Sequence, residues 1–133
     1  MRKSRGPHVS PDAPGAALPK GASMARPASR RPKMWLFLDD VRPAPKGWVP
    51  VRTPGDFVYL VTHYDWDVIS FDNDLSGQHT DITGRQLLHW MFEEEILPRQ
   101  KPRVHSGDLL AAPRMRAFIE QQWPEVLKKR GQR

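Results

Sequence analysis

The stretch MWLFLDDVRPAPKGW, residues 34–48, decides the fold prediction because a short apolar run ends in two adjacent aspartates. Trp35 to Leu38 is apolar without alternation, which is typical of a parallel strand that is covered on both faces. Asp39 and Asp40 follow at once. The pattern predicts a buried strand that places two carboxylates at its C-terminal end.

The same design returns further along the chain. Residues 68–71 form a second apolar run, and residues 102–105 are short enough to be a last strand. Residues 48–52 form a possible further strand, and Pro50 predicts an edge position for it because proline cannot donate to a central ladder. Polar residues stand at the ends of two of these runs. Asp72, Asn73 and Asp74 follow residues 68–71, and His105 and Ser106 lie at the end of the last strand.

Amphipathic stretches separate these strands. Thr53 and Pro54 predict a helix start, since the hydroxyl can cap free backbone N–H groups and proline fits the first helical position. A second helix is expected over residues 83–95, with Gly84 in close approach to the sheet. A final helix is expected to stop near Pro124. Strands that alternate with helices predict an α/β fold with a mostly parallel sheet.

The positive charge is concentrated at the N-terminus. The chain has a formal net charge of +6, but residues 1–33 hold eight of its 21 Lys and Arg residues and one of its 15 acidic residues. The same segment holds six of the 14 prolines and almost no large apolar residue, so we interpret it as disordered. Three alternatives stay open: a basic arm for RNA, DNA or another anionic partner, an organellar presequence, or an extension upstream of an internal start at Met24 or Met34.

The remaining chain predicts one domain. We expect it over residues 34–125, with residues 126–133 as a solvated basic C-terminal end. Without cysteine, the chain has neither disulfides nor thiolate metal sites. No apolar run approaches the length of a membrane span, so a membrane partner is not expected and a cytoplasmic location fits.

The polar residues at the strand ends predict a shared site. If the strands are parallel, their C-terminal ends lie at one edge of the sheet, where ligands bind in open α/β folds. Clustered carboxylates repel one another unless a cation is present, and hard oxygen ligands suit Mg²⁺ or Mn²⁺. The predicted metal ligands are Asp39, Asp40, Asp72 and Asp74.

Further residues at this edge suit a phosphate group. His105 is the natural proton donor or acceptor, Arg42 can clamp a phosphate, and Ser106 can hold another phosphoryl oxygen. Taken singly, these side chains have ordinary explanations: a turn-capping aspartate, a structural histidine, a surface arginine. Matched groups at three separate strand ends favour the shared site. Catalytic roles are predicted for His105 and Asp72, and substrate-binding roles for Arg42, Ser106 and Asn73.

These motifs resemble response-regulator receiver domains, and more closely the cyclic-phosphate processing receiver domains of bacteria and phages. The resemblance rests on LFLDDVRPAPKGW, VRTP, ISFDND, the TG that precedes LLHW, and RVHS, and it extends over about residues 34–119. It implies a small flavodoxin-like, three-layer fold with about four strands. It also implies metal-dependent action on cyclic phosphates, such as cyclic nucleotides or RNA ends, at the acidic residues together with His105 and Ser106.

Two departures from the family pattern affect the functional prediction. Asn73 stands where we expect histidine more often, which shifts the acid or base role to His105. The fifth receiver strand with its lysine is not recognisable, which disfavours ordinary phospho-signalling. Three functions are therefore weighed: a hydrolase of cyclic phosphates, a divergent receiver phosphorylated on Asp72, and a binding protein that senses metal or nucleotide.

Overall fold

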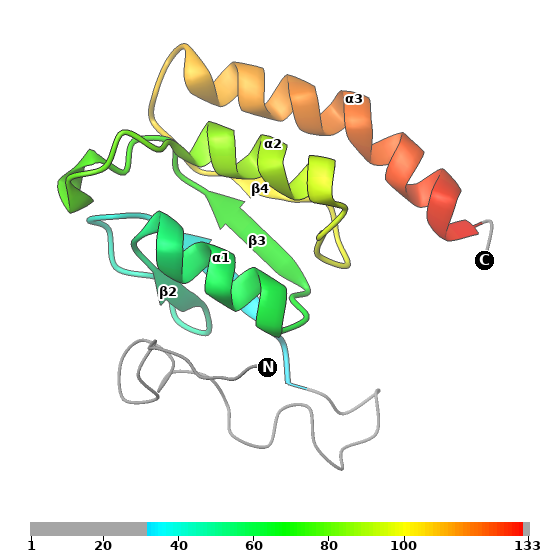
Figure 1. Ribbon diagram of the computed structural model, residues 1–133, viewed down its shortest axis with the longest axis horizontal. Coiled ribbons are helices and arrows are strands. Elements are labelled where there is room, and N and C mark those ends of the chain that lie inside the picture. The colour runs from blue at the N-terminus through cyan, green and yellow to red at the C-terminus, as the bar shows by residue number, and fades with distance from the viewer. Residues whose placement is uncertain (1–31, 132–133) are drawn as a thin grey trace.

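A four-stranded sheet forms the centre of the chain (Figure 1). A computed structural model describes residues 32–131, so the predictions for residues 1–31 lie outside the described residues. Neighbouring strands are parallel and follow the order β2-β1-β3-β4. This arrangement confirms the α/β class, the parallel sheet and the edge position of the Pro50 strand. The strands are β1 (Trp35–Leu38), β2 (Val49–Val51), β3 (Val68–Phe71) and β4 (Arg103–Val104).

Helices follow β2, β3 and β4, and the first two begin where the sequence predicts. Thr53 caps α1 by accepting a hydrogen bond from the backbone N–H of Asp56, at 3.1 Å. Thr83 caps α2 in a reciprocal capping box with Gln86. The helices are α1 (Pro54–His63), α2 (Gly84–Glu94) and α3 (Ala111–Gly131), with a short 3₁₀ helix η3 (Ser76–Gln78) between β3 and α2.

The last helix is longer than predicted. We expected it to stop near Pro124, but α3 continues to Gly131, so residues 126–131 are helical. Two contacts hold the helix beyond the proline. Trp123 is buried and its ring meets that of Phe92 edge-on at 6.4 Å. Arg130 donates hydrogen bonds to the carbonyls of Pro98 and Arg99, at 2.7 and 2.8 Å. These tertiary contacts offset the backbone hydrogen bond that proline cannot make.

One face of the sheet carries the main apolar core. Successive strand residues point to opposite faces, so Leu36 and Leu38 share a face with Ile69 and Phe71, their partners in register. All four side chains are almost fully buried and belong to one cluster with residues of α1 and α2. The helix residues of this cluster include Phe57, Leu60, Leu87, Leu88 and Met91.

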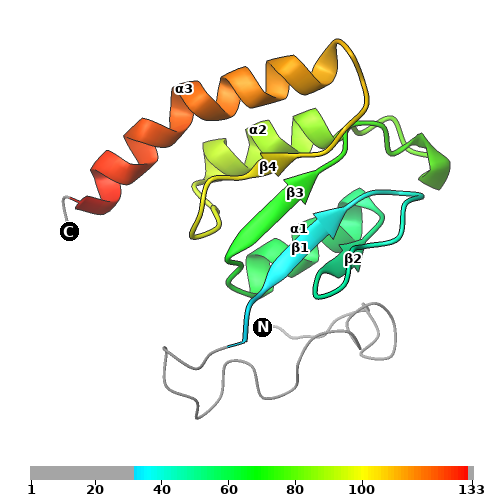
Figure 2. The same ribbon diagram turned by 180° about the vertical axis from the view of Figure 1, so that it is seen from behind.

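The other face has no helix over it among residues 32–131, which differs from the expected three layers. In Figure 1, α1 and α2 lie in front of the strands, and α3 lies beside α2 along the β4 side. In Figure 2, seen from behind, β1, β3 and β4 lie in front. The topology explains this difference. The connections from β2 to β3 and from β3 to β4 run in the same direction, so right-handed crossovers place both helices on one face. The connection of opposite direction, from β1 to β2, contains no helix.

Aromatic side chains cover much of this helix-free face instead. The ring of Trp48 lies 5.1 Å from that of Trp35 and 5.9 Å from that of Phe37. The imidazole of His105 stacks on the ring of Phe37, with 4.0 Å between the ring centres and 8° between the ring planes. Phe37 and Val68 are buried although no helix packs on them. This open face, defined by Trp35, Phe37, Trp48, Ser70 and Arg103, leads directly to the acidic end of the sheet.

Candidate functional site

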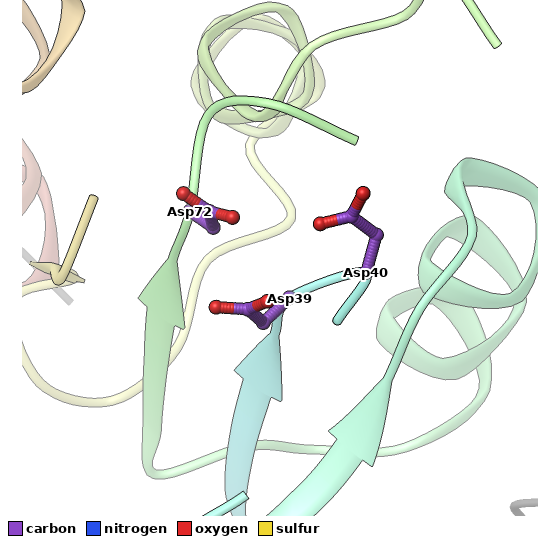
Figure 3. Close-up of side chains that lie close together, drawn as sticks. All are labelled: Asp39, Asp40 and Asp72. Carbon is purple, nitrogen blue, oxygen red and sulfur yellow. The ribbon is translucent and has the colours of Figure 1, made fainter. Parts of the chain in front are cut away.

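Three carboxylates meet at the C-terminal edge of the sheet, as predicted (Figure 3). Asp39 and Asp40 follow β1, and Asp72 follows β3. The two strands are adjacent and in register, so their first following residues lie level with each other. One oxygen from each carboxylate lies within 4.8 Å of the others. Oxygen donors at this spacing fit a hard divalent cation such as Mg²⁺ or Mn²⁺.

Asp39 is the most buried member, with 1% of its surface exposed. Its Oδ1 accepts hydrogen bonds from the backbone N–H groups of Val41 and Arg42, at 3.0 and 2.8 Å. Burial by itself would raise the pKa of Asp39, but these two N–H groups and His105 together hold it below its usual value. Asp39 is therefore a fixed, ionised carboxylate at the base of the site.

Asp72 differs from Asp39 in its electrostatics. Burial raises the pKa of Asp72, the backbone N–H of Asn73 lowers it through a 2.8 Å hydrogen bond, and the charge of Asp39 raises it further. The net shift is upward. Two neighbouring buried carboxylates of this kind cost free energy when both are ionised, and a bound cation would offset that cost. The donor set thus fits a metal ion both in chemistry and in charge.

The fourth predicted ligand, Asp74, does not join this group. Its side chain is exposed, and its Oδ1 accepts a hydrogen bond from the backbone N–H of Ser76 at 2.9 Å. Hydrogen bonds from Ser76 lower the pKa of Asp74. Asp40 also braces this loop, since its Oδ2 accepts from the backbone N–H of Gly77 at 2.8 Å. Asp74 shapes the start of η3, while Asp40 connects the loop to the acidic group.

His105 lies beside the acidic group with both ring nitrogens engaged. Its Nε2 is 3.1 Å from Oδ2 of Asp39, and its Nδ1 is 2.7 Å from the hydroxyl of Ser70. Because an ionised carboxylate only accepts, Nε2 carries a proton, and Nδ1 of the neutral ring accepts from Ser70. Burial lowers the pKa of His105, and Asp39 only partly opposes this. Ser70 was not among the predicted site residues, although a polar residue within an apolar strand is a usable signal.

Two arginines lie at the rim of the site. Arg42 donates from Nη1 to the carbonyl of His105 at 3.1 Å, and its Nε is 3.9 Å from Oδ2 of Asp39. Its side chain is 53% exposed, so N–H groups remain open to a ligand. Arg52, to which we assigned no role, donates to the carbonyls of Asp39 and Arg42 at 3.4 and 3.3 Å. The guanidinium of Arg42 is therefore held in place and accessible, as a phosphate-binding role requires.

The other two predicted substrate-binding residues build turns. Oδ1 of Asn73 accepts from the backbone N–H of Arg85 at 3.1 Å, which satisfies a donor in the first turn of α2. Ser106 is buried, and its hydroxyl accepts from the backbone N–H of Asp108 at 3.0 Å. Both residues lie at strand ends next to the acidic group. These hydrogen bonds fix the turns beside the site, and the substrate-binding roles of Asn73 and Ser106 stay predictions.

Gly84 sets the position of Asp72. A Cβ atom added at Gly84 would lie 1.6 Å from the carbonyl oxygen of Asp72, a distance that no side chain can occupy. The backbone N–H of Gly84 donates to the carbonyl of Asn73 at 2.8 Å. The first turn of α2 therefore packs directly on the chain that leaves β3, which confirms the predicted close approach of this glycine to the sheet.

Comparison with known proteins identifies a family for most of the chain. The family model described as cyclic-phosphate processing receiver domain matches residues 34–121, which include all the acidic residues of the group. No curated protein and no solved structure gives a significant match to the chain. Within the part of the chain that the structure describes, none of the helices has the length and apolar character needed to span a membrane.

Proposed function

We propose a function from one premise: the chain belongs to the cyclic-phosphate processing receiver domain family. The proposed reaction is the metal-dependent hydrolysis of a cyclic phosphodiester, carried by a phosphate-containing small molecule such as a cyclic nucleotide or by an RNA end. The observation that supports it most is the group of three carboxylate oxygens within 4.8 Å of one another.

The carboxylates of Asp39, Asp40 and Asp72 would hold the cation. A divalent ion supplies charge that polarises a phosphoryl oxygen and stabilises the transition state. The buried Asp39, fixed by backbone N–H groups, gives the site a rigid base. Asp72 benefits most from a positive neighbour, because burial and the charge of Asp39 raise its pKa.

Arg42 would orient the phosphate. The carbonyl of His105 fixes one nitrogen of its guanidinium, and the remaining exposed N–H groups match the oxygens of a phosphate. Gly107 lies beside it, since an added Cβ at that position would be 3.8 Å from Nη2 of Arg42, an ordinary contact distance. The turn that begins at Ser106 would present the backbone N–H of Gly107 to a second phosphoryl oxygen.

His105 would supply the proton for the leaving group. In the proposed step, water attacks phosphorus, one ring P–O bond breaks, and the released oxygen takes the Nε2 proton from the protonated form of His105. The attacking water gives its proton to solvent. Ser70 at Nδ1 keeps the ring in the plane that directs Nε2 toward the acidic group.

The first test measures turnover by the full chain on a panel of cyclic phosphates. The panel contains 2′,3′-cyclic nucleotides, 3′,5′-cyclic nucleotides and RNA with a cyclic end, each with Mg²⁺ or Mn²⁺ and with a chelator. Multiple turnover that the chelator and Asp39→Asn both abolish is the expected result. No turnover across the panel, together with stoichiometric phosphorylation of Asp72 by a small phosphodonor, would contradict hydrolysis and favour the receiver function.

A matched pair of histidine variants tests the proton step. His105→Ala should lower turnover by about 100-fold or more, the range for loss of a general acid, while Mn²⁺ binding persists. His89→Ala is the control, because His89 stacks on Phe118 at 3.8 Å, on α2 rather than at the acidic edge. Normal turnover by His105→Ala would show that His105 is not the proton donor.

A further inference from the structure

The open face of the sheet presents aromatic rings that are not fully buried. Trp35 and Trp48 each keep an intermediate exposure, whereas Phe37 beneath them is buried. The two indole rings are tilted by 55° to each other and are 5.1 Å apart. None of the three helices of the described chain lies over this face (Figure 2). The rings therefore form a surface that another flat group can reach.

Two cations flank these rings. The guanidinium of Arg103 lies 5.8 Å from the ring centre of Trp48, and the ammonium of Lys33 lies 4.8 Å from that of Trp35. Both side chains are exposed. Neither forms an ion pair with a carboxylate of residues 32–131. Positive charge at both margins of an aromatic surface complements a ligand that combines flat rings with anionic groups.

The aromatic surface is continuous with the acidic group. Asp39 contacts the ring of His105 at 3.1 Å, that ring stacks on Phe37, and Phe37 meets Trp48 edge-on. This path runs from the C-terminal edge of the sheet back along β1. A ligand whose phosphate lies at the acidic group would therefore have its adjoining units next to the tryptophans.

We propose that the open face binds unpaired bases of single-stranded RNA whose phosphate end lies at the acidic group. The inference rests on the proposed function for the position of the phosphate, and it names the oligonucleotide, rather than the free nucleotide, as the preferred substrate class. Bases stack on Trp35 and Trp48 irrespective of their identity, and Lys33 and Arg103 contact the phosphates between them. Charge is the reason for choosing RNA over an apolar protein partner, which would have to bury both cations.

The test compares two oligonucleotides of equal charge. Each is a short RNA with a 3′-phosphate, which is not a cyclic phosphodiester, and in one of them the three units next to that phosphate lack bases. The full-length chain should bind the intact oligonucleotide about 100-fold more tightly, since two stacked bases contribute about tenfold each. Trp48→Leu should reduce this difference about tenfold, whereas Trp48→Phe, which keeps a ring, should reduce it much less. Equal binding of both oligonucleotides by the wild-type chain would overturn the proposal.

Two charge-reversal variants give a second test that leaves both tryptophans in place. Arg103→Glu should weaken oligonucleotide binding several-fold more than Arg114→Glu, which makes the same change of charge on the exposed side of α3. Equal effects of the two variants would mean that only the overall charge matters, and would contradict a site on this face. A wild-type dimer that Trp48→Leu converts to a monomer would also overturn the proposal, because the face would then join two copies.

The failure of this inference is distinguishable from failure of the proposed hydrolysis. KM for an RNA with a cyclic end should rise about tenfold in Trp48→Leu, whereas KM for a cyclic mononucleotide, which lacks the adjoining units, should rise much less. If no cyclic phosphate is turned over but base-dependent binding persists, the stacking surface stands and the hydrolase proposal falls. If turnover occurs but removal of the bases does not affect binding, the hydrolase proposal stands and the stacking surface falls.

Discussion

The two faces of the sheet use the same strands but are covered in different ways. Toward α1 and α2, the strands present Leu36, Leu38, Ile69 and Phe71, which join one continuous core with the helices. On the open face, alternate residues of the same strands contact the side chains of Trp48 and His105, and Arg103 lies over Trp48. Helices α1 and α2 cover one face of the sheet, and single side chains cover the other.

This difference separates stability from function. A core between a sheet and helices excludes water over a broad area and contributes most of the hydrophobic stabilisation. Side chains that cover a face alone stay near solvent and can exchange partners without unfolding the domain. His105 illustrates the second case, since it covers Phe37 and also contacts Asp39. We therefore expect substitutions on the covered face to affect stability and those on the open face to affect binding.

The largest effect is expected from Leu88→Ala, which opens a cavity in the covered face. Leu88 is fully buried between α2 and the sheet, so the variant should lose about 3 to 5 kcal/mol of unfolding free energy. Urea denaturation measures this loss. Leu109→Ala is the control, because Leu109 is 89% exposed and its truncation should change stability by less than about 0.5 kcal/mol. A loss below about 1 kcal/mol for Leu88→Ala would break the contrast between the two faces.

Gly84→Ala tests where the covered face meets the site. The added methyl group would collide with the carbonyl of Asp72, so α2 must shift, at a cost of about 2 to 3 kcal/mol and with weaker Mn²⁺ binding. Gly55→Ala is the matched control: it lies in α1 with no atom within 4 Å of the added Cβ, and should be neutral or stabilising. Thermal denaturation and Mn²⁺ titration of both variants measure these effects. Unchanged metal binding by Gly84→Ala would show that Asp72 does not depend on this contact.

A smaller effect is expected from Trp35→Leu on the open face. The variant loses a tilted ring contact with Trp48 and the cation contact with Lys33, together about 1 kcal/mol. Urea denaturation should therefore give a loss well below that of Leu88→Ala. A loss as large as that of Leu88→Ala would mean that the open face is a second core, and the division between the two faces would have to be abandoned.

The smallest expected effect is a dependence of stability on pH that originates on the open face. Burial lowers the pKa of His105 below its unfolded value, although Asp39 partly opposes this. Protonation then favours the unfolded chain, so stability should fall as pH decreases through the unfolded value of about 6.5. In chelator, His105→Asn should remove this part of the dependence, measured as unfolding free energy at about pH 7.5 and about pH 5.5. If the unfolding free energy of His105→Asn changes with pH as much as that of the wild type, the pH dependence originates from other groups.

Local sequence signals predicted the elements of this fold well. Apolar runs located β1 and β3, the hydroxyl cap Thr53 located the start of α1, and the helical pattern over residues 83–95 located α2. The acidic group was also predictable, because the parallel topology brings the ends of β1 and β3 together. These features depend on short-range preferences and on one rule of connectivity, both of which are readable in a single chain.

Two of the features that were not predicted depend on distant partners, and the third depends on a local hydrogen bond. An apolar strand run such as Trp35 to Leu38 does not reveal whether a helix or two indoles cover each face. The continuation of α3 past Pro124 depends on contacts of Trp123 and Arg130 with residues of other segments. The position of Asp74 outside the acidic group depends on a local hydrogen bond to Ser76 that competes for its carboxylate. In the first two cases tertiary contacts outweighed the local signal, and for Asp74 a local hydrogen bond decided the outcome.

The hydrogen bond between Asp40 and Gly77 makes one backbone amide a reporter for the site. In the described arrangement, the N–H of Gly77 donates to Oδ2 of Asp40 at 2.8 Å, and this bond connects the loop after β3 to the acidic group. A ligand that draws this oxygen away from the loop would release that amide. The rate at which the Gly77 proton exchanges with deuterated solvent would then rise when the site is filled, although the protein as a whole becomes more stable. A spectroscopist could thus follow occupancy at a position that has no side chain.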